Sequence, residues 1–214
     1  MHRWLATLAL AALVTTAGHA SAAERVIVAL GDSLTAGFGV AREEAYPALL
    51  EARLAREGHD YRVINAGVSG DTTAGGLRRL DWVLRSAPEV VIVALGANDG
   101  LRALPTATMR SNLTTIVERS RAAGAKVLLV GMRLPPNYGP QYTRAFERVF
   151  VEVAEATRVP LLPFLLEGVA GERRLNLADG IHPNAEGQRR IAEHIWPHLR
   201  ALLVAPGTLR GVSR

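Results

Sequence analysis

A serine stands where a short apolar run ends. The run from Val26 to Leu30 stops at Gly31, and Asp32 and Ser33 follow directly. A run of this length indicates a buried parallel strand, and open α/β sheets bind ligands at the carboxyl ends of such strands. Ser33 is therefore either the cap of a helix or a nucleophile. A nucleophilic serine needs a base, an acid that orients the base, and hydrogen-bond donors for the oxyanion.

His182 is the candidate base. The other histidines lie in the amino-terminal leader, in a turn before the second strand, or near the carboxyl end, and they are His2, His19, His59, His194 and His198. Asp179 precedes His182 by three residues and can accept a hydrogen bond from the ring nitrogen that faces away from the serine. Gly180 permits the tight bend this needs, and Pro183 favours an extended backbone at His182. The alternative is a capped helix start, in which Asp179 and Asn184 bind backbone N–H groups.

Two further loops supply candidate donors for an oxyanion. Gly70 follows the second apolar run, and a residue without a side chain lets its backbone N–H approach a ligand closely. Asn98 follows the third run and offers its side-chain amide. The backbone N–H of Ser33, at the start of its helix, is the third candidate donor. The alternative for Gly70 and Asn98 is a simple turn, where both residue types are common.

Apolar runs alternate with helical patterns along the chain, and this alternation predicts how the candidate residues meet. The expected strands are Val26–Leu30, Tyr61–Asn65, Val90–Leu95, Lys126–Gly131 and Pro160–Phe164. The expected helices are Glu43–Glu57, Thr73–Arg85, Thr108–Ala123, Tyr142–Thr157 and Ala185–Leu202. Strand–helix alternation predicts an α/β fold: a three-layer α/β/α sandwich around a five-stranded parallel sheet, doubly wound and flavodoxin-like. Loops after different strands then converge at one edge of the sheet.

The amino terminus has the three-part pattern of a signal peptide. A basic start is followed by an apolar run from Trp4 to Val14 and by small residues that end at Ala22. We expect a signal peptide at 1–22, a single domain at 23–205 and a frayed tail at 206–214. The apolar run is too short for an ordinary membrane span. The sequence thus predicts export to the periplasm or the medium, with no stable membrane insertion after cleavage.

Composition narrows the range of partners. The chain has a net charge of +5 and no cysteine. Its arginines are scattered rather than clustered with aromatic residues, which argues against a nucleic-acid partner. Without cysteine there are neither disulfides nor thiolate metal ligands. His194 and His198 have the spacing of a metal-binding pair but no obvious third ligand, so we expect no metal ion. We also expect no cofactor, and we expect the protein to be a monomer.

Taken together, these segments resemble the SGNH (GDSL) hydrolase family. The matching blocks are Gly31-Asp32-Ser33-Leu34, Gly70, Gly96-Ala97-Asn98-Asp99 and Asp179-Gly180-Ile181-His182-Pro183. Four blocks in this order, each after an expected strand or before the last helix, are far more specific than any one of them. Two departures are visible. Thr35 replaces the second glycine of the α/β-hydrolase elbow, which disfavours that fold. Ala97 stands where the nearest branch of the family has a further glycine.

The resemblance implies a function and a set of roles. It implies hydrolysis of a small acyl ester or thioester through an acyl-enzyme, in a branch with periplasmic thioesterases, lysophospholipases and arylesterases. Its catalytic residues would be Ser33, Asp179 and His182, and its oxyanion hole would be Ser33, Gly70 and Asn98. Residues expected to bind substrate lie after the asparagine block and after the fourth strand, and they are Asp99, Gly100, Leu101, Leu104, Leu134 and Tyr138.

Two other functions fit parts of the pattern. The first is a carbohydrate O-deacetylase of the same superfamily. The second is a non-catalytic, flavodoxin-like protein that binds a phosphate ligand through the glycine-bearing loop from Gly31 to Gly39. That second alternative leaves Asn98 and the pair Asp179 and His182 without a role.

Overall fold

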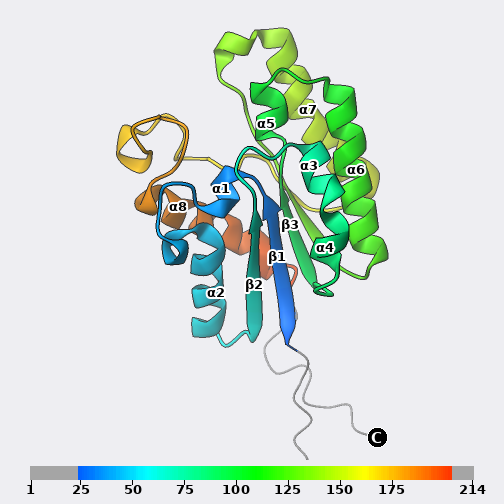
Figure 1. Ribbon diagram of the computed structural model, residues 1–214, viewed down its shortest axis with the longest axis vertical. Coiled ribbons are helices and arrows are strands. Elements are labelled where there is room, and N and C mark those ends of the chain that lie inside the picture. The colour runs from blue at the N-terminus through cyan, green and yellow to red at the C-terminus, as the bar shows by residue number, and fades with distance from the viewer. Residues whose placement is uncertain (1–23, 204–214) are drawn as a thin grey trace, which may run out of the picture.

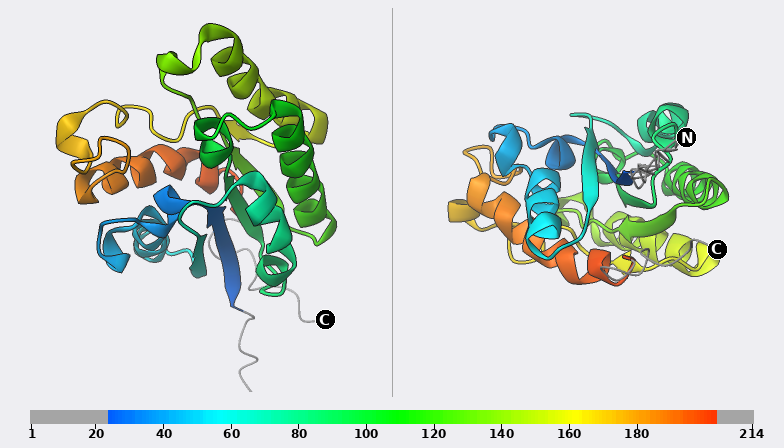
Figure 2. Two further views of the ribbon diagram at one scale, coloured as in Figure 1. Left: turned by 45° about the horizontal axis from the view of Figure 1, so that its top comes forward. Right: turned by 90° about the horizontal axis from the view of Figure 1, so that it is seen from below.

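The computed structural model describes residues 24–203, which form a parallel five-stranded sheet covered by helices on both faces (Figures 1 and 2). The strands are β1 (Arg25–Gly31), β2 (Tyr61–Gly67), β3 (Val90–Ala94), β4 (Lys126–Val130) and β5 (Leu161–Leu162), in the order β2-β1-β3-β4-β5. The expected three-layer α/β/α fold is confirmed. The expectations for residues 1–22 and 206–214 lie outside the described residues.

Eight α-helices and three 3-10 turns connect the described strands. The helices are α1 (Ser33–Ala36), α2 (Tyr46–Arg56), α3 (Thr73–Arg78), α4 (Leu80–Leu84), α5 (Ala97–Leu101), α6 (Thr106–Ala122), α7 (Pro140–Thr157) and α8 (Ala185–Arg200). The 3-10 turns are η1 (Arg42–Glu44), η2 (Pro136–Tyr138) and η3 (Arg173–Leu175). None of the helices within 24–203 has the length and apolarity needed to cross a bilayer.

Alternate residues of the strands pack on opposite faces of the sheet. Ile27 and Ala29 of β1 belong to a buried cluster with α2 and α8, whereas Val28 and Leu30 belong to a second cluster with α4, α6 and α7. Figure 1 shows the same division, with α2 and α8 on one side of β1 and β2 and α3, α4, α6 and α7 on the other. The last helix buries an apolar stripe, Ile191, Ile195 and Leu199, in the first cluster. These residues are spaced by one helical turn.

The sheet order places the crevice for a ligand beside β1. Strand β1 pairs with β2 on one side and with β3 on the other, so the strand order reverses at β1. Open α/β sheets bind ligands at such a point. Gly31, the last residue of β1, is in register with Gly67 of β2 and Ala94 of β3. The loops that leave these three strands therefore begin side by side.

Two elements differ clearly from those expected. The helix expected over Thr73–Arg85 is two short helices, because Arg79 adopts φ −100° and ψ 6° between them. The last strand is reduced to Leu161–Leu162, at the edge of the sheet. The last helix runs through Pro197, which stands in its final turns, where few backbone hydrogen bonds remain to be lost.

Candidate active site

Ser33 occupies the first position of α1, directly after the sharp turn that ends β1. Asp32 caps this helix, and its Oδ1 accepts a hydrogen bond from the backbone N–H of Leu34 at 3.0 Å. A Cβ on Gly31 would collide with the side chain of Thr35 and crowd the carbonyl oxygen of Ala94. The turn therefore depends on a glycine before the Asp-Ser pair, and no second glycine is needed after the serine.

His182 connects Ser33 to Asp179. The His182 Nε2 lies 2.9 Å from the Ser33 Oγ, and the His182 Nδ1 lies 2.7 Å from the Asp179 Oδ2. The Asp179 Oδ1 also accepts hydrogen bonds from the backbone N–H groups of Ile181 and His182. These two backbone N–H groups, His182 first, together with the His182 ring, lower the pKa of Asp179 to about 2. Asp179 thus stays ionised near neutral pH, as an acid that orients a catalytic histidine must.

The turn that carries the base is held locally. Gly180 adopts a left-handed φ of 71°, and the backbone N–H of Leu177 donates to the carbonyl oxygen of His182 at 2.7 Å. Asn184, and not Asp179, caps α8 by accepting from the backbone N–H groups of Glu186 and Gly187. The capping expected of Asn184 and the contact between Asp179 and His182 therefore occur together.

Phe38, a residue that the sequence analysis did not select, packs on the ring of His182. The two ring centroids are 4.6 Å apart and the planes meet at 41°. Phe38 lies between Gly37 and Gly39, which both have a φ of 77°, and this left-handed pair turns the chain back over the end of α1. One face of the imidazole is thereby covered, although 49% of Phe38 remains exposed. The only feature of the sequence that could have indicated this contact is an aromatic residue shortly after the nucleophile.

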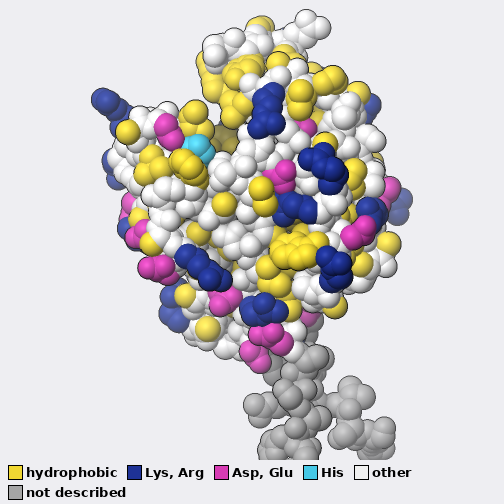
Figure 3. Space-filling view, in the orientation of Figure 1, with side chains coloured by type: hydrophobic (Ala, Val, Ile, Leu, Met, Phe, Trp, Pro, Cys, Tyr) yellow, Lys and Arg dark blue, Asp and Glu magenta, His cyan; other side chains and the backbone are white. Residues whose placement is uncertain are grey.

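Large hydrophobic side chains are exposed on the loops around Ser33. They are Phe38, Val68, Leu101, Leu104 and Ile181. In Figure 3, hydrophobic side chains gather on both sides of a recess in the upper part of the molecule. Exposed apolar surface that clusters in this way is typical of sites that bind apolar groups.

Three of the residues expected to bind substrate are buried, and they are Asp99, Gly100 and Leu134. Asp99 is 3% exposed, and its carboxylate accepts hydrogen bonds from the backbone N–H and the Oγ1 of Thr73 at 2.8 and 2.6 Å. Gly100 is also buried, and a Cβ there would meet Phe146 and Leu134. Neither Asp99 nor Gly100 presents a free surface, and their contact with substrate stays a prediction.

The other residues expected to bind substrate, Leu101, Leu104 and Tyr138, are exposed or partly exposed. Leu101 and Leu104 are 38% and 37% exposed, whereas the buried Leu134 lies next to Gly100. The Tyr138 hydroxyl donates to the carbonyl oxygen of Leu101 at 3.0 Å, and the Tyr142 hydroxyl donates to that of Leu104 at 2.8 Å. These two bonds tie the loop after Asn98 to the start of α7. Tyr142 was missed because a hydroxyl–backbone bond leaves no pattern in a sequence.

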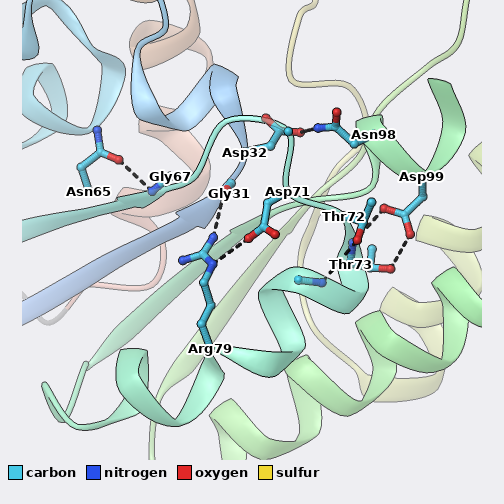
Figure 4. A network of polar contacts seen from close by, with 12 residues as sticks. Gly31, Asp32, Asn65, Gly67, Asp71, Thr72, Thr73, Arg79, Asn98 and Asp99 are labelled. Carbon is cyan, nitrogen blue, oxygen red and sulfur yellow. Dashed lines mark hydrogen bonds and ion pairs between the residues drawn. The ribbon is translucent and has the colours of Figure 1, made fainter. Parts of the chain in front are cut away.

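Asn98 lies against a buried carboxylate (Figure 4). Its Nδ2 donates to the Asp32 Oδ2 at 3.2 Å, and Asp32 is only 2% exposed. Burial raises the pKa of Asp32 to about 6, although the hydrogen bonds from Leu34 and Asn98 act in the opposite direction. Asn98 uses one amide hydrogen on Asp32, which leaves the other for a ligand. The sequence analysis did not assign Asp32 a role, since its burial follows only from the packing of the loops.

Gly70 lies on the neighbouring loop in a conformation that favours glycine. Its φ is 80°, and its carbonyl oxygen accepts a hydrogen bond from the Arg102 Nη2 at 2.8 Å. Arg102 follows α5, so this bond connects the loop after β2 to the loop after β3. Nothing but this long side chain approaches the position of a Cβ on Gly70. The loop is thus open on the side of the missing side chain.

The described residues contain no group of three or more His, Asp or Glu side chains that could hold a metal ion. The ring centroids of His194 and His198 are 6.3 Å apart, but the His194 Nε2 lies 3.1 Å from the backbone carbonyl oxygen of Phe164. Burial, and then the neighbouring His194, lower the pKa of His198. The pair therefore has the contacts of an ordinary helix surface.

Comparison with known proteins gives consistent matches over nearly all of the described residues. Residues 29–190 match the model of the GDSL-like Lipase/Acylhydrolase family. The chain is 49% identical over 183 residues to "Esterase TesA" of Pseudomonas aeruginosa, a match that covers 85% of this chain and 91% of that protein. It is 39% identical over 192 residues to "Thioesterase 1/protease 1/lysophospholipase L1" of Escherichia coli, covering 89% and 90%. A solved structure, "Crystal Structure of TesA", superposes with a TM-score of 0.81 at 48% identity, covering 84% of this chain and all of that one.

Proposed function

The chain belongs to the GDSL-like Lipase/Acylhydrolase family, and we propose that Ser33, His182 and Asp179 are the catalytic triad of this protein. The protein is a hydrolase of carboxylic ester and thioester bonds. The observation that carries the assignment is the unbroken chain of contacts from the Ser33 Oγ to His182 and on to Asp179, at 2.9 and 2.7 Å. This is the geometry in which a histidine can accept the proton of a serine.

Acylation begins when Ser33 attacks the acyl carbonyl. The His182 Nε2 takes the hydroxyl proton while the Ser33 Oγ forms a bond to the carbonyl carbon, and the π electrons move to the carbonyl oxygen. The resulting oxyanion is stabilised by the backbone N–H groups of Ser33 and Gly70 and by the free amide hydrogen of Asn98. The tetrahedral intermediate then expels the alcohol or thiol, which receives the proton from His182.

Deacylation repeats these steps with water. His182 takes a proton from the water molecule as its oxygen attacks the acyl-enzyme carbonyl, and the same three donors stabilise the second oxyanion. The Ser33 Oγ leaves with the proton from His182 and the carboxylic acid is released. Asp179 remains ionised throughout and stabilises the imidazolium that forms twice in each cycle. The residues that act here require no metal ion.

The triad is tested by Ser33→Ala, with Ser111→Ala as the matched control. Ser111 is an exposed serine of α6 that has no assigned part in the site. We expect hydrolysis of p-nitrophenyl butyrate to fall by about 10⁴-fold or more in Ser33→Ala and to be unchanged in Ser111→Ala. A fluorophosphonate should label Ser33 in the wild-type chain, as detected by peptide mass spectrometry. Retention of wild-type turnover or of labelling in Ser33→Ala refutes the assignment.

We propose that the acyl chain lies along the exposed leucines of the loop after Asn98. Leu101 and Leu104 are the apolar side chains presented there, and tyrosine hydroxyls hold the loop in place. Leu104→Ala should lower kcat/KM for octanoyl esters by about 5- to 10-fold, roughly the effect of losing contact with one or two methylenes, and leave acetyl esters unaffected. Val151→Ala removes an equally exposed side chain from α7 and serves as the control. A preference for acetylated sugars over octanoyl esters would instead favour a carbohydrate deacetylase.

We also propose that the protein is exported and that the first 22 residues are removed. The proposal is supported by the basic start, the apolar run and the small residues that end at Ala22. Expression of the full chain in a bacterium should yield a periplasmic or secreted protein whose intact mass begins at Ala23. Recovery of the full-length chain from the cytoplasm would contradict this.

A further inference from the structure

The three loops that carry the proposed oxyanion donors are joined to one another by side chains. Asp32, beside Ser33, accepts a hydrogen bond from Asn98, and this bond joins the loop after β1 to the loop after β3. Asp99, beside Asn98, accepts from the backbone N–H and the hydroxyl of Thr73, and this joins the loop after β3 to the loop after β2. These bonds join two of the three pairs of loops. The remaining pair consists of the loop of Ser33 and the loop of Gly70.

Arg79 joins this remaining pair of loops, beside a backbone hydrogen bond from the N–H of Val68 to the carbonyl oxygen of Gly31 at 3.1 Å. Its Nη2 donates to the carbonyl oxygen of Gly31 at 2.8 Å, and its Nε donates to the Asp71 Oδ2 at 2.7 Å. In Figure 4 the side chain of Arg79 extends from the junction of α3 and α4 to a point between these two partners. Gly31 is two residues before Ser33, and Asp71 directly follows Gly70. The guanidinium thus contacts the backbone just before one proposed donor and the side chain just after another.

The residues around Arg79 bury its side chain and leave room for this contact. The Arg79 and Asp71 side chains are largely buried, with 19% and 13% of their surfaces exposed. A Cβ on Gly75 would occupy the place of the Asp71 carboxylate, so a glycine in α3 makes room for the ion pair. The backbone at Arg79 leaves the helical conformation, and this break ends α3 and lets the side chain reach the sheet edge.

A guanidinium can hold both partners because its donors are fixed in one plane. Nε and Nη2 are separated by the rigid geometry of the group, so the carbonyl of Gly31 and the carboxylate of Asp71 are held at a set distance. A lysine ammonium is a point charge on a flexible stem and cannot fix that distance. Oxyanion holes act through donors that are already in place before charge develops, and small displacements weaken them.

We propose that Arg79 is a positioning residue that sets the separation between the Ser33 and Gly70 N–H groups, two of the donors of the oxyanion hole. The inference rests on the proposed function, because it assigns Arg79 a purpose only if these groups stabilise an oxyanion. Arg79 acts through the two loops and does not contact the substrate. Its loss should therefore affect the transition state more than the bound substrate.

The test is Arg79→Lys, with Arg119→Lys as the matched control. Arg119 also pairs with an aspartate, Asp81, but on the outer surface of α4 and α6. For p-nitrophenyl butyrate we expect Arg79→Lys to lower kcat by about 10- to 100-fold, part of the effect of losing one oxyanion donor, with KM within about two-fold of wild type. The inhibition constant of an alkyl boronic acid, which forms a tetrahedral adduct on Ser33, should rise by the same factor. Arg119→Lys should behave as wild type in all three measurements.

Two results would overturn the inference. One is a folded Arg79→Lys with wild-type kcat, and the other is a variant in which KM rises while kcat and the boronic acid constant do not change. If circular dichroism shows that Arg79→Lys does not fold, Asp71→Ala decides, because it removes the carboxylate that accepts from the Arg79 Nε and leaves Arg79 bound to Gly31; unchanged kcat in that variant also overturns the inference. Ser33→Ala is measured in parallel. Activity in Ser33→Ala refutes the proposed function, whereas loss of activity there with wild-type kcat in Arg79→Lys refutes only the role of Arg79.

Discussion

Replacing Asp32 by asparagine should make the protein more stable and much less active. Asp32 is 2% exposed, and its two oxygens accept hydrogen bonds from the Leu34 N–H and the Asn98 amide. Asparagine has the same shape and can still cap α1 through its oxygen. Its NH₂ group, however, faces the NH₂ group of Asn98. Asn98 can satisfy it only by turning its own amide over, which presents a carbonyl oxygen where a donor is needed.

The two effects have different sizes and opposite signs. Burial raises the pKa of Asp32 from 3.8 to about 6, and each pKa unit corresponds to about 1.4 kcal/mol, so ionised Asp32 costs the folded state about 3 kcal/mol. Asp32→Asn removes that cost and should raise the free energy of unfolding at pH 7 by up to about 3 kcal/mol. Each kcal/mol should raise Tm by about 2–4 °C. Loss of one oxyanion donor costs about 2.7–4 kcal/mol, which predicts a fall in kcat of about 10²- to 10³-fold.

The dependence on pH identifies the cause. Because the folded state holds the proton of Asp32 more tightly than the unfolded state, the wild-type chain gains stability as the pH falls, and this gain is complete below about pH 4 and lost as the pH rises through about 6. The stability difference between Asp32→Asn and wild type should therefore be largest at pH 7 and shrink towards pH 4. Urea unfolding at pH 7, 6 and 5, with kcat measured on the same samples, gives both quantities.

The control is Asp60→Asn, which changes an exposed aspartate in the turn before β2. It should alter neither kcat nor the pH dependence of unfolding. The reasoning is refuted if Asp32→Asn is less stable than wild type at pH 7, or if its stability difference does not vary with pH. Wild-type kcat in Asp32→Asn would show that the orientation of Asn98 does not depend on this carboxylate.

Three further substitutions test other parts of the site. Asp179→Asn should lower kcat by about 10³- to 10⁴-fold with little change in KM, because the amide no longer holds the histidine in the active tautomer; steady-state kinetics of ester hydrolysis checks this, and a fall of less than ten-fold would contradict it. Phe38→Ala should lower kcat by about 3- to 10-fold, the value of an aromatic contact on His182, and Phe38→Tyr should restore it in the same assay. Asp99→Asn should lower the free energy of unfolding by about 1–3 kcal/mol, since one of the two Thr73 donors loses its acceptor, and thermal denaturation that leaves Tm unchanged would count against this role.

The position of Ser33 and the pairing of Asp179 with His182 could be anticipated from the sequence because both depend on local features. Apolar runs define the parallel strands, and the carboxyl ends of parallel strands lie on one edge whatever the intervening chain does. Ser33 follows the first run directly, so its position was fixed by the strand itself. The Asp179–His182 pair is held by a turn of four residues, and the spacing allowed that contact, with helix capping as the alternative.

The parts that were not predicted depend on packing between distant segments. Neither the burial of Asp32 nor the covering of His182 by Phe38 follows from neighbouring residues. Asp99 was expected to bind substrate, yet its carboxylate is buried and accepts hydrogen bonds from Thr73 at the start of α3. The single helix expected over Thr73–Arg85 is broken at Arg79 because the Arg79 side chain bonds to Gly31 and Asp71, and this tertiary contact outweighs helix propensity.

The turn that carries Asp179 and His182 has a consequence for how activity is lost. Its own backbone bonds fix the acid against the base, so only one distance in the triad, from His182 to Ser33, depends on the tertiary fold. That distance joins residues 149 positions apart in the chain. Enzymatic activity is therefore a sensitive reporter of how the segment before α8 docks on α1. Mild denaturation that loosens this docking will inactivate the protein before the parallel sheet unfolds.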